Sequence, residues 1–329
     1  MPRIVRFHET GGPEVLKLEE VPLQEPGPDE VRLKVEALGL NRAEVMYHYG
    51  QYVPIQSFPS RIGYEAAGVV DAVGSDVKGV KVGDRVSTIP SFDIGVHGVY
   101  GESATVPAHA VAAYPDNLDA TEGAAIWMQY LTAWGGLVRI ADIKAGDAVI
   151  ITAASSSVGI AAIQICNAVG AVPIATTRTS AKRQNLLDLG ARHVIATEEE
   201  DLAEKVMGIT DGMGAALAFD PIAGPMLEKL AGAVRPGGMI IVYGALHPEP
   251  TILPILPLAM KGITVRPYVL FQFTTDPEAL EAGKRFVFEG LGSGKLKPVI
   301  DRVFTLDQIV DAHRHMESNT QLGKIVVKV

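Results

Sequence analysis

The sequence predicts an α/β protein in which a doubly wound parallel sheet is joined to a mostly antiparallel β domain. From Asp147 onward, short apolar runs rich in β-branched residues alternate with stretches of helical periodicity, which is typical of parallel sheets. Before about residue 120, short alternating runs lie between Gly- and Pro-rich turns, which is typical of antiparallel sheets. A chain of 329 residues is long enough for two such domains.

The first domain is marked by the run Glu30–Glu36, which places apolar residues on one face of a strand and charged residues on the other. Clusters of turn-forming residues lie at Pro26–Asp29 and Lys81–Asp84. Helical spacing from Thr121 to Ala141 marks the entry into the second domain, and the strand-like run 324–329 is expected to rejoin the first. The expected boundaries are therefore 1–122 with 270–329 for the first domain and 123–269 for the second.

Six runs of the second domain are expected to form the parallel sheet: 147–153, 172–177, 193–196, 215–219, 239–243 and about 263–266. The first two, with the helical run that ends at Gly170, have the size of one strand–helix–strand unit. In dinucleotide-binding sheets, the turn of this unit lets backbone N–H groups approach a pyrophosphate. An ordinary strand–helix turn is the alternative. Small side chains fill this turn, and we predict that the following residues bind a dinucleotide: Ser155, Ser156, Ser157, Val158 and Gly159.

The end of the second strand carries hydroxyls and cations where an NAD site would carry an acid. Thr177 and Arg178 are followed by Lys182 and Arg183. A guanidinium and an ammonium suit a 2′-phosphate, and cations at this end of a helix do not complement its dipole. The sequence therefore predicts NADPH rather than NADH. The alternative is that these cations form the solvated first turn of a helix.

Composition argues against several classes of partner. The net charge is −9 and the pI is about 5.4, which disfavours nucleic acid and anionic membranes. We find no signal peptide and no apolar run long enough to span a bilayer. The chain has a single cysteine, Cys166, so an intrachain disulfide framework is excluded. Cys166 lies in an apolar helical run. A cytoplasmic protein that acts on a small molecule is expected.

A series of motifs in the first domain carries a family resemblance. Asn41 is followed by Gly50-x-Tyr52 and then by Gly63-x-Glu65-x-x-Gly68-x-Val70. Further matching runs extend over essentially the whole chain, among them 81–86, 122–125, 131–134, 153–164, 170–171, 189–191 and 323–324. The sequence resembles the zinc-free quinone oxidoreductase branch of the medium-chain dehydrogenase/reductase superfamily, which includes zeta-crystallin-like proteins and enoyl reductases. This resemblance implies a GroES-like catalytic domain and a Rossmann domain that binds NADPH.

The resemblance also implies a reaction and its residues. Zinc-dependent relatives hold the metal with cysteines in the first domain, which has none here, and Tyr64 stands where they carry a ligand histidine. No metal is therefore expected. Hydride transfer to a quinone or to an α,β-unsaturated carbonyl compound is expected instead, with Asn41 and Tyr52 donating hydrogen bonds to the substrate carbonyl. A turn role for Asn41 and a packing role for Tyr52 are the alternatives.

Two other functions stay open. One is an enoyl-thioester (enoyl-CoA or acyl-carrier-protein) reductase, and the other is a low-turnover, crystallin-like protein that binds NADPH.

Further cofactor contacts are expected where strands end, because ligands of open α/β sheets bind there. These residues are Tyr243, Gly244 and Phe271, and Gln129 and Thr132 on the entering helix could face the nicotinamide or serve packing. The apolar segment Thr251–Phe273 should contain the edge strand of the sheet. An exposed apolar edge favours pairing with a second copy, so a homodimer through this strand is expected, with an internal crossover as the alternative.

Overall fold

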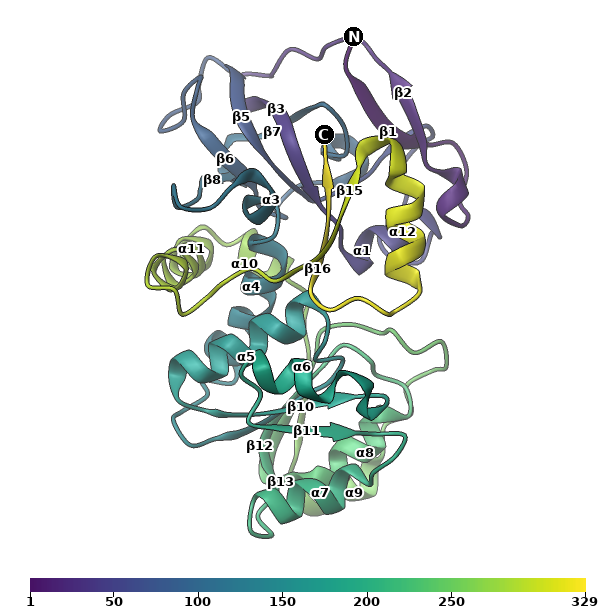
Figure 1. Cartoon of the computed structure of the whole chain (residues 1–329), viewed down its shortest axis with the longest axis vertical. Helices are drawn as coiled ribbons and strands as arrows, with labels where there is room; N and C mark the ends of the chain where they lie inside the picture. Colours follow the sequence, from purple (N-terminus) through teal and green to yellow (C-terminus); the bar gives the residue numbers. More distant parts are fainter. The chain divides into compact units, whose positions relative to one another are not determined.

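The computed structural model describes residues 1–329 and divides them into two compact units (Figure 1). The first unit contains Met1–Met128 and Pro298–Val329, and the second contains Gln129–Lys297. Residues 270–297, which we expected in the first domain, lie in the second unit. The expected domain boundaries at residues 122 and 270 stay a prediction.

A seven-stranded sheet forms the centre of the first unit. Its path runs β15 (Ile300–Thr305), β16 (Lys324–Lys328), β3 (Glu30–Gly39), β5 (Glu65–Val73), β6 (Arg85–Thr88) and β8 (Val111–Ala113). β7 (Ser103–Pro107) also pairs with β3. All pairs are antiparallel except β15 with β16, whose parallel pairing is made possible by the crossover helix α12 (Ile309–Glu317). The predicted antiparallel domain and the return of the last strand are confirmed.

Smaller elements complete this unit. A three-stranded sheet has the order β2 (Lys17–Glu20), β1 (Arg3–Phe7) and β4 (Ser60–Arg61). The short helices are α1 (Arg42–His48), α2 (Ile94–His97) and α3 (Ala120–Gly123). Asp119 caps α3 through a reciprocal capping box with Glu122, which explains why the chain turns helical at this point.

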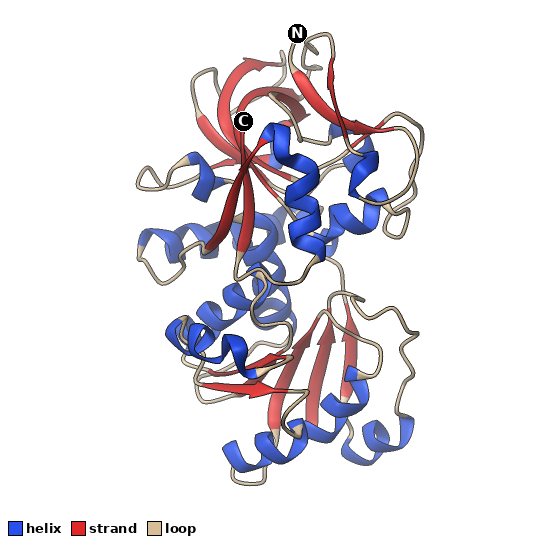
Figure 2. Ribbon diagram, turned by 45° about the vertical axis from the view of Figure 1, so that its right-hand side comes forward, coloured by secondary structure: helices blue, strands red, loops and turns tan.

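The second unit is built on a six-stranded parallel sheet. The strand order is β11 (His193–Ala196), β10 (Val172–Thr177), β9 (Ala148–Ile151), β12 (Ala215–Asp220), β13 (Val234–Val242) and β14 (Thr264–Pro267). The order reverses direction at β9, so the helices must cover both faces, as Figure 2 shows. The predicted doubly wound sheet is confirmed, and β14 is an edge strand as expected.

Apolar packing on one face of this sheet involves α7 (Leu202–Ile209), α8 (Met226–Ala233) and α9 (Ile255–Lys261). Their buried side chains pack against inward residues of β9, β10, β12 and β13, such as Ile150 and Ile240. On other parts of the sheet, α5 (Ser157–Val169) contacts β9 and β10, and α6 (Arg183–Asp188) contacts β11. These contacts hold the parallel sheet, and the candidate site lies at the carboxyl ends of its strands.

The entering helical stretch is interrupted in a way that the sequence did not predict. α4 (Trp127–Trp134) continues as a π-helix over Gly135–Ile140. A Cβ on Gly135 would lie 2.7 Å from the Phe273 ring, and one on Gly136 would lie 2.5 Å from the Phe219 ring. The two glycines therefore allow aromatic rings of α10 (Phe271–Thr274) and β12 to approach the helix backbone. The last long helix of the unit is α11 (Pro277–Gly292).

Candidate functional site

The turn after β9 is held by a side-chain cap and by the close packing of its small residues. Ser156 is the N-cap of α5, and its Oγ accepts a hydrogen bond from Gly159 N at 3.1 Å. A Cβ on Gly159 would lie 2.6 Å from the Cα of Ala154, so no larger residue fits there. Ala153 takes a φ of +46°, which bends the chain sharply before the helix. Because the first N–H groups of a helix lack partners within it, this turn suits an anion such as a pyrophosphate.

Lys182 brings the end of β10 to this turn. Its Nζ donates to the Oγ of Ser155 at 3.2 Å, although 27 residues separate them in the sequence. Thr177 ends β10, and its carbonyl accepts a hydrogen bond from Thr197 N at 2.9 Å. Arg178, the next residue, is exposed. An ammonium group and serine hydroxyls thus lie together where a phosphate beside the turn would need donors.

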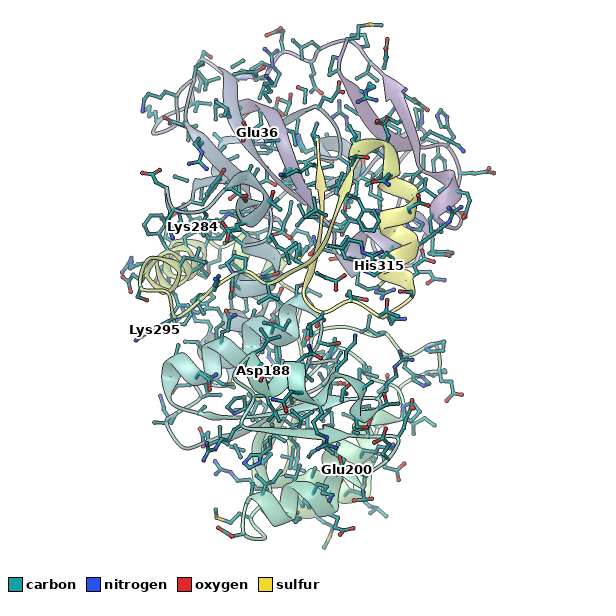
Figure 3. The ribbon with its side chains drawn as sticks, viewed as in Figure 1. Glu36, Asp188, Glu200, Lys284, Lys295 and His315 are labelled. Carbon is teal, nitrogen blue, oxygen red and sulfur yellow. The ribbon has the colours of Figure 1, made fainter.

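The neighbouring cation Arg183 is used within the protein. Its guanidinium donates to the carbonyl of Val194 at 2.6 Å and to Glu200 at 2.5 Å (Glu200 is labelled in Figure 3). The hydrogen bond from Ala196 N and the pairing with Arg183 lower the pKa of Glu200 to about 2. Arg183 therefore fastens α6 to the end of β11.

An acid lies near the predicted 2′-phosphate site, which the sequence analysis missed. Glu199 Oε1 accepts hydrogen bonds from Ser180 N at 2.9 Å and from Ser180 Oγ at 3.3 Å. Glu199 follows β11, not β10, so the rule that looks for an acid at the end of the second strand does not find it. Its carboxylate accepts the hydrogen bond of the Ser180 backbone N–H, and Ser180 lies two residues before Lys182.

At the carboxyl ends of β12 and β13, a buried carboxylate shapes the loops. Asp220 accepts hydrogen bonds from Thr152 Oγ1, from Ile222 N at 3.1 Å and from Ala223 N at 2.8 Å. Gly244 approaches the next loop so closely that a Cβ would lie 3.0 Å from the carbonyl oxygen of Pro221. The ring of Tyr243 stacks on Phe219 at a centroid distance of 4.1 Å. The tight loops leave little room for side chains beside the strand ends.

Three buried side-chain oxygens of the second unit have no hydrogen-bond partner in the protein. They are Gln129 Oε1, Tyr243 Oη and Thr274 Oγ1. Thr132 is also buried, and its carbonyl accepts a hydrogen bond from the hydroxyl of Tyr268. Since an unpartnered buried polar atom costs free energy, Gln129 and Tyr243 fit contacts to a polar ligand. Phe271 begins α10 in the same unit.

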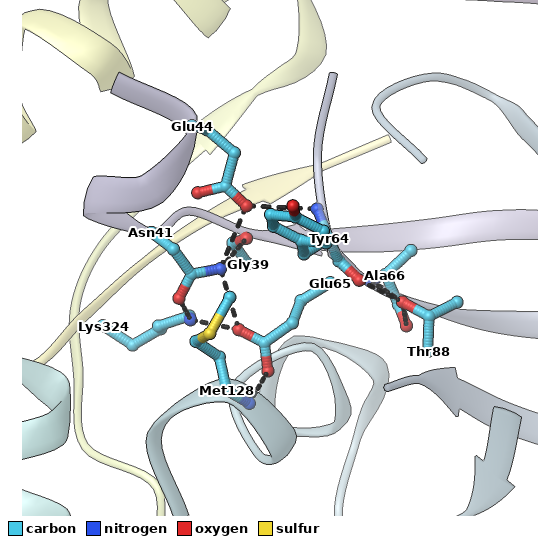
Figure 4. A network of polar contacts seen from close by, with 9 residues as sticks. All are labelled: Gly39, Asn41, Glu44, Tyr64, Glu65, Ala66, Thr88, Met128 and Lys324. Atoms are coloured by element: carbon cyan, nitrogen blue, oxygen red, sulfur yellow. Dashed lines mark hydrogen bonds and ion pairs between the residues drawn. The ribbon is translucent and has the colours of Figure 1, made fainter. Parts of the chain in front are cut away.

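In the first unit, Asn41 lies inside a buried polar network (Figure 4). Its Nδ2 donates to Glu44 and to Glu65, each at 3.1 Å. Lys324 Nζ donates to Asn41 Oδ1 at 2.6 Å and also pairs with Glu65. The other oxygen of Glu65 accepts from Met128 N at 2.9 Å. The amide group of Asn41 is thus occupied within the protein by Glu44, Glu65 and the carbonyl of Gly39, and its role as a donor to substrate stays a prediction.

Tyr52 lies beside this network with 37% of its surface exposed. Its ring contacts Tyr64 edge to face at a centroid distance of 6.5 Å. Burial and the charge of Glu44 raise the pKa of Tyr52 to about 12, although a hydrogen bond with the Tyr64 side chain opposes this. Tyr52 therefore keeps its phenolic proton at neutral pH and is available as a donor.

The remaining titratable groups form no metal-binding cluster in residues 1–329: no three His, Cys, Asp or Glu side chains gather suitably for an ion. Cys166 is buried, and burial raises the pKa of its thiol. His48 and His313 form a buried pair that was not predicted from the sequence. His48 Nε2 lies 3.3 Å from His313 Nδ1. None of the helices combines the length and apolar character needed to cross a lipid bilayer.

Two family models match the chain. Residues 27–116 match the model described as alcohol dehydrogenase GroES-like domain, and residues 157–310 match the one described as zinc-binding dehydrogenase. Among curated proteins, the quinone oxidoreductases of Homo sapiens and Pseudomonas aeruginosa are 32% and 30% identical to it; each alignment covers 99% of this chain and 97% or 99% of the relative. A 2-haloacrylate reductase of Burkholderia sp is 30% identical over 98% of this chain and 97% of its own length.

Solved structures agree with these relatives. The quinone oxidoreductase of Pseudomonas syringae superposes with a TM-score of 0.92 at 28% identity, covering 100% of both chains. The quinone oxidoreductase of Escherichia coli, complexed with NADPH, gives a TM-score of 0.91 at 29% identity over 99% of this chain and 100% of that one. The CurK enoyl reductase gives 0.89 at 27% identity, with 99% of each chain covered.

The full-length matches and the two domain models agree with each other. The fold contains the expected β-rich unit and the doubly wound parallel sheet, with the serine-lined turn after its first strand. The chain is an oxidoreductase and belongs to the quinone oxidoreductase branch of the medium-chain dehydrogenase/reductase superfamily.

Proposed function

We propose that the chain is an NADPH-dependent reductase of quinones or α,β-unsaturated carbonyl compounds that works without zinc. The observation that carries this proposal is the contact of Lys182 with Ser155, which joins a cation to the anion-binding turn. The relatives support it, since a quinone oxidoreductase of Escherichia coli and a mycobacterial protein are each solved with NADPH. The curated relatives include quinone and 2-haloacrylate reductases.

The residues present fit this cofactor. The turn Ser155–Gly159 would hold the pyrophosphate with backbone N–H groups, and Lys182 with Arg178 would bind the 2′-phosphate. Gln129 and Tyr243 offer polar atoms that lack a partner in the protein, as the amide end of a nicotinamide requires. When bound, NADPH supplies the hydride.

Tyr52 is the residue that we assign to the substrate. Its phenol holds a proton at neutral pH, because its pKa is raised to about 12. It can donate a hydrogen bond to the carbonyl oxygen of a substrate, where negative charge develops as the conjugated double bond is reduced. The same proton is available to that substrate afterwards. Asn41 would be the second polar group near the substrate, oriented by its hydrogen bonds with Glu44, Glu65 and Lys324.

An enoyl-thioester reductase is the second candidate, favoured by the likeness to CurK enoyl reductase. A low-turnover, crystallin-like protein that binds NADPH is the third. The test is steady-state oxidation of NADPH with 1,4-benzoquinone, 9,10-phenanthrenequinone, a series of 2-alkenals and crotonyl-CoA, repeated with NADH. We expect turnover with quinones or alkenals and a preference for NADPH. Turnover with crotonyl-CoA alone would favour the second candidate, and tight NADPH binding without any oxidation would favour the third.

The zinc-free assignment is tested by metal analysis and by the response of activity to a chelator. Elemental analysis of the purified protein should return far less than one zinc per chain, and NADPH oxidation should persist after treatment with a chelator. One zinc per chain would contradict the assignment. We also propose a cytoplasmic location and a homodimer through the free edge of β14.

A further inference from the structure

Glu44 is a fully buried carboxyl group with only half of its hydrogen-bonding capacity used. It lies in α1, and its Oε1 accepts hydrogen bonds from Asn41 Nδ2 and from Tyr64 N, both at 3.1 Å (Figure 4). Its Oε2 is buried and has no partner. A buried carboxylate oxygen without a donor is costly, whereas a protonated carboxyl is tolerated there. The site therefore favours a neutral Glu44.

The charged groups around Glu44 come from two strands. Lys324 on β16 pairs with Glu65 on β5 and also binds Asn41, so the lysine charge is already matched by a carboxylate. Lys324 stabilises an ionised Glu44, and Glu65 opposes it. The tyrosines that are sensitive to the charge of Glu44 are Tyr52, Tyr64 and Tyr100. The pKa of Glu44 is raised to about 7, and burial of the carboxyl group is the largest cause of this rise.

Tyr64 connects Glu44 to Tyr52. Its backbone N–H binds the carboxyl of Glu44, and its ring packs edge to face against Tyr52. The Tyr64 side chain also acts on the Tyr52 phenol, because it lowers the pKa of Tyr52 against the effect of burial. The carboxyl and the phenol are therefore held in one arrangement by a single buried residue that is 1% exposed.

We propose that Glu44 is a positioning residue that acts through Tyr52, and that the proton on its buried carboxyl sets how readily the Tyr52 phenol donates to substrate. This inference rests on the proposed function, in which Tyr52 binds the substrate carbonyl. A negative charge near a phenol disfavours the phenolate and makes the phenol a weaker acid. With Glu44 protonated, Tyr52 is the stronger donor. When the pH rises through 7 and Glu44 ionises, Tyr52 becomes the weaker one.

The kinetic test is the pH profile of kcat/KM for a 2-alkenal with NADPH. We expect the wild-type value to fall by at least about threefold between pH 6 and pH 8. Glu44→Gln, which keeps the shape but cannot ionise, should hold the low-pH value across this range. Glu44→Asp, which keeps an ionisable group, should retain an inflection. The matched control is Glu317→Gln, which removes another carboxyl of the first unit whose pKa is raised by burial and which should leave the inflection in place. An inflection that survives in Glu44→Gln overturns the proposal.

A second measurement separates this inference from the proposed function. In protein labelled with ¹³C at the glutamate carboxyl and the tyrosine ring carbons, the Glu44 carboxyl should titrate near pH 7. The Tyr52 ring signal should move with it, and that movement should vanish in Glu44→Gln. A Glu44 that titrates near its ordinary value, or a Tyr52 signal that does not respond, overturns the inference. If no acceptor in the panel is reduced, the proposed function fails, and this titration still decides whether the two groups are coupled.

Discussion

At the scale of single residues, we propose that Lys182 is the side chain that most directly selects NADPH over NADH. Replacing Lys182 and Arg178 together by Ala should weaken NADPH binding by at least about tenfold, because charged hydrogen bonds to a phosphate contribute about 1.5–3 kcal/mol each. NADH binding should change little, since it lacks the 2′-phosphate. Fluorescence titration of both nucleotides gives the two Kd values. Equal losses for NADPH and NADH would contradict the assignment of the 2′-phosphate site.

Glu199 should have the opposite effect. Its carboxylate accepts from Ser180 N, so a phosphate beside Lys182 would meet a negative charge. Glu199→Gln should tighten NADPH binding several-fold and leave NADH unchanged. Glu198→Gln, in the same exposed loop, is the control and should alter neither value. If Glu199→Gln weakens NADPH binding instead, the carboxylate helps to shape the site and does not compete with the phosphate.

The sequence alone reached part of the candidate site, and sequence separation explains the difference. The serine-lined turn is local: the cap from Ser156 to Gly159 spans three residues, so small side chains after a strand were enough to predict it. Glu199 was missed because it comes from another loop, 19 residues beyond Ser180. Glu65 and Lys324 are 259 residues apart, so no local sequence pattern indicates that they form an ion pair.

At the scale of elements, the network around Asn41 joins β5 and β16 to the segment that follows β3. Lys324 is 1% exposed, and removing its charge would leave Glu65 buried without a cation. Lys324→Met should lower the free energy of unfolding by about 3–5 kcal/mol, measured by urea denaturation. Lys328→Met, on the same strand but exposed, is the control and should stay within about 0.5 kcal/mol of wild type. If Lys324→Met lowers the free energy of unfolding no more than Lys328→Met does, the network contributes little to stability.

The elements themselves were largely predictable. The runs and their spacing identified all six strands of the parallel sheet, and the central strands β9 and β12 were clearest because strands buried on both faces are continuously apolar. The π-helix over Gly135–Ile140 was not predicted, because its cause is tertiary. The rings of Phe219 and Phe273 lie against Gly136 and Gly135, and no local pattern announces such distant partners.

At the scale of the whole molecule, the free edge of β14 and its exposed apolar neighbours support the proposed homodimer. Ile252, Leu256 and Met260 are 81%, 75% and 86% exposed in the segment that leads to this strand. Such a surface favours association with a second copy. Leu256→Asp with Met260→Asp should convert a dimer into a monomer in analytical ultracentrifugation. Met213→Asp, 65% exposed elsewhere in the second unit, is the control. A wild-type chain that sediments as a monomer would contradict the proposal.

The pairing of β16 with β3 has a consequence for synthesis on the ribosome. Ala37–Gly39 of β3 bind Val326–Lys328, which are translated almost 290 residues later. At typical elongation speeds of about 5–20 residues per second, this margin of β3 waits roughly 15–60 s for its neighbour. Residues 129–297, which form the second unit, emerge during that delay. The nascent polypeptide can therefore complete its parallel sheet while the earlier-made β sheet is still open along one side.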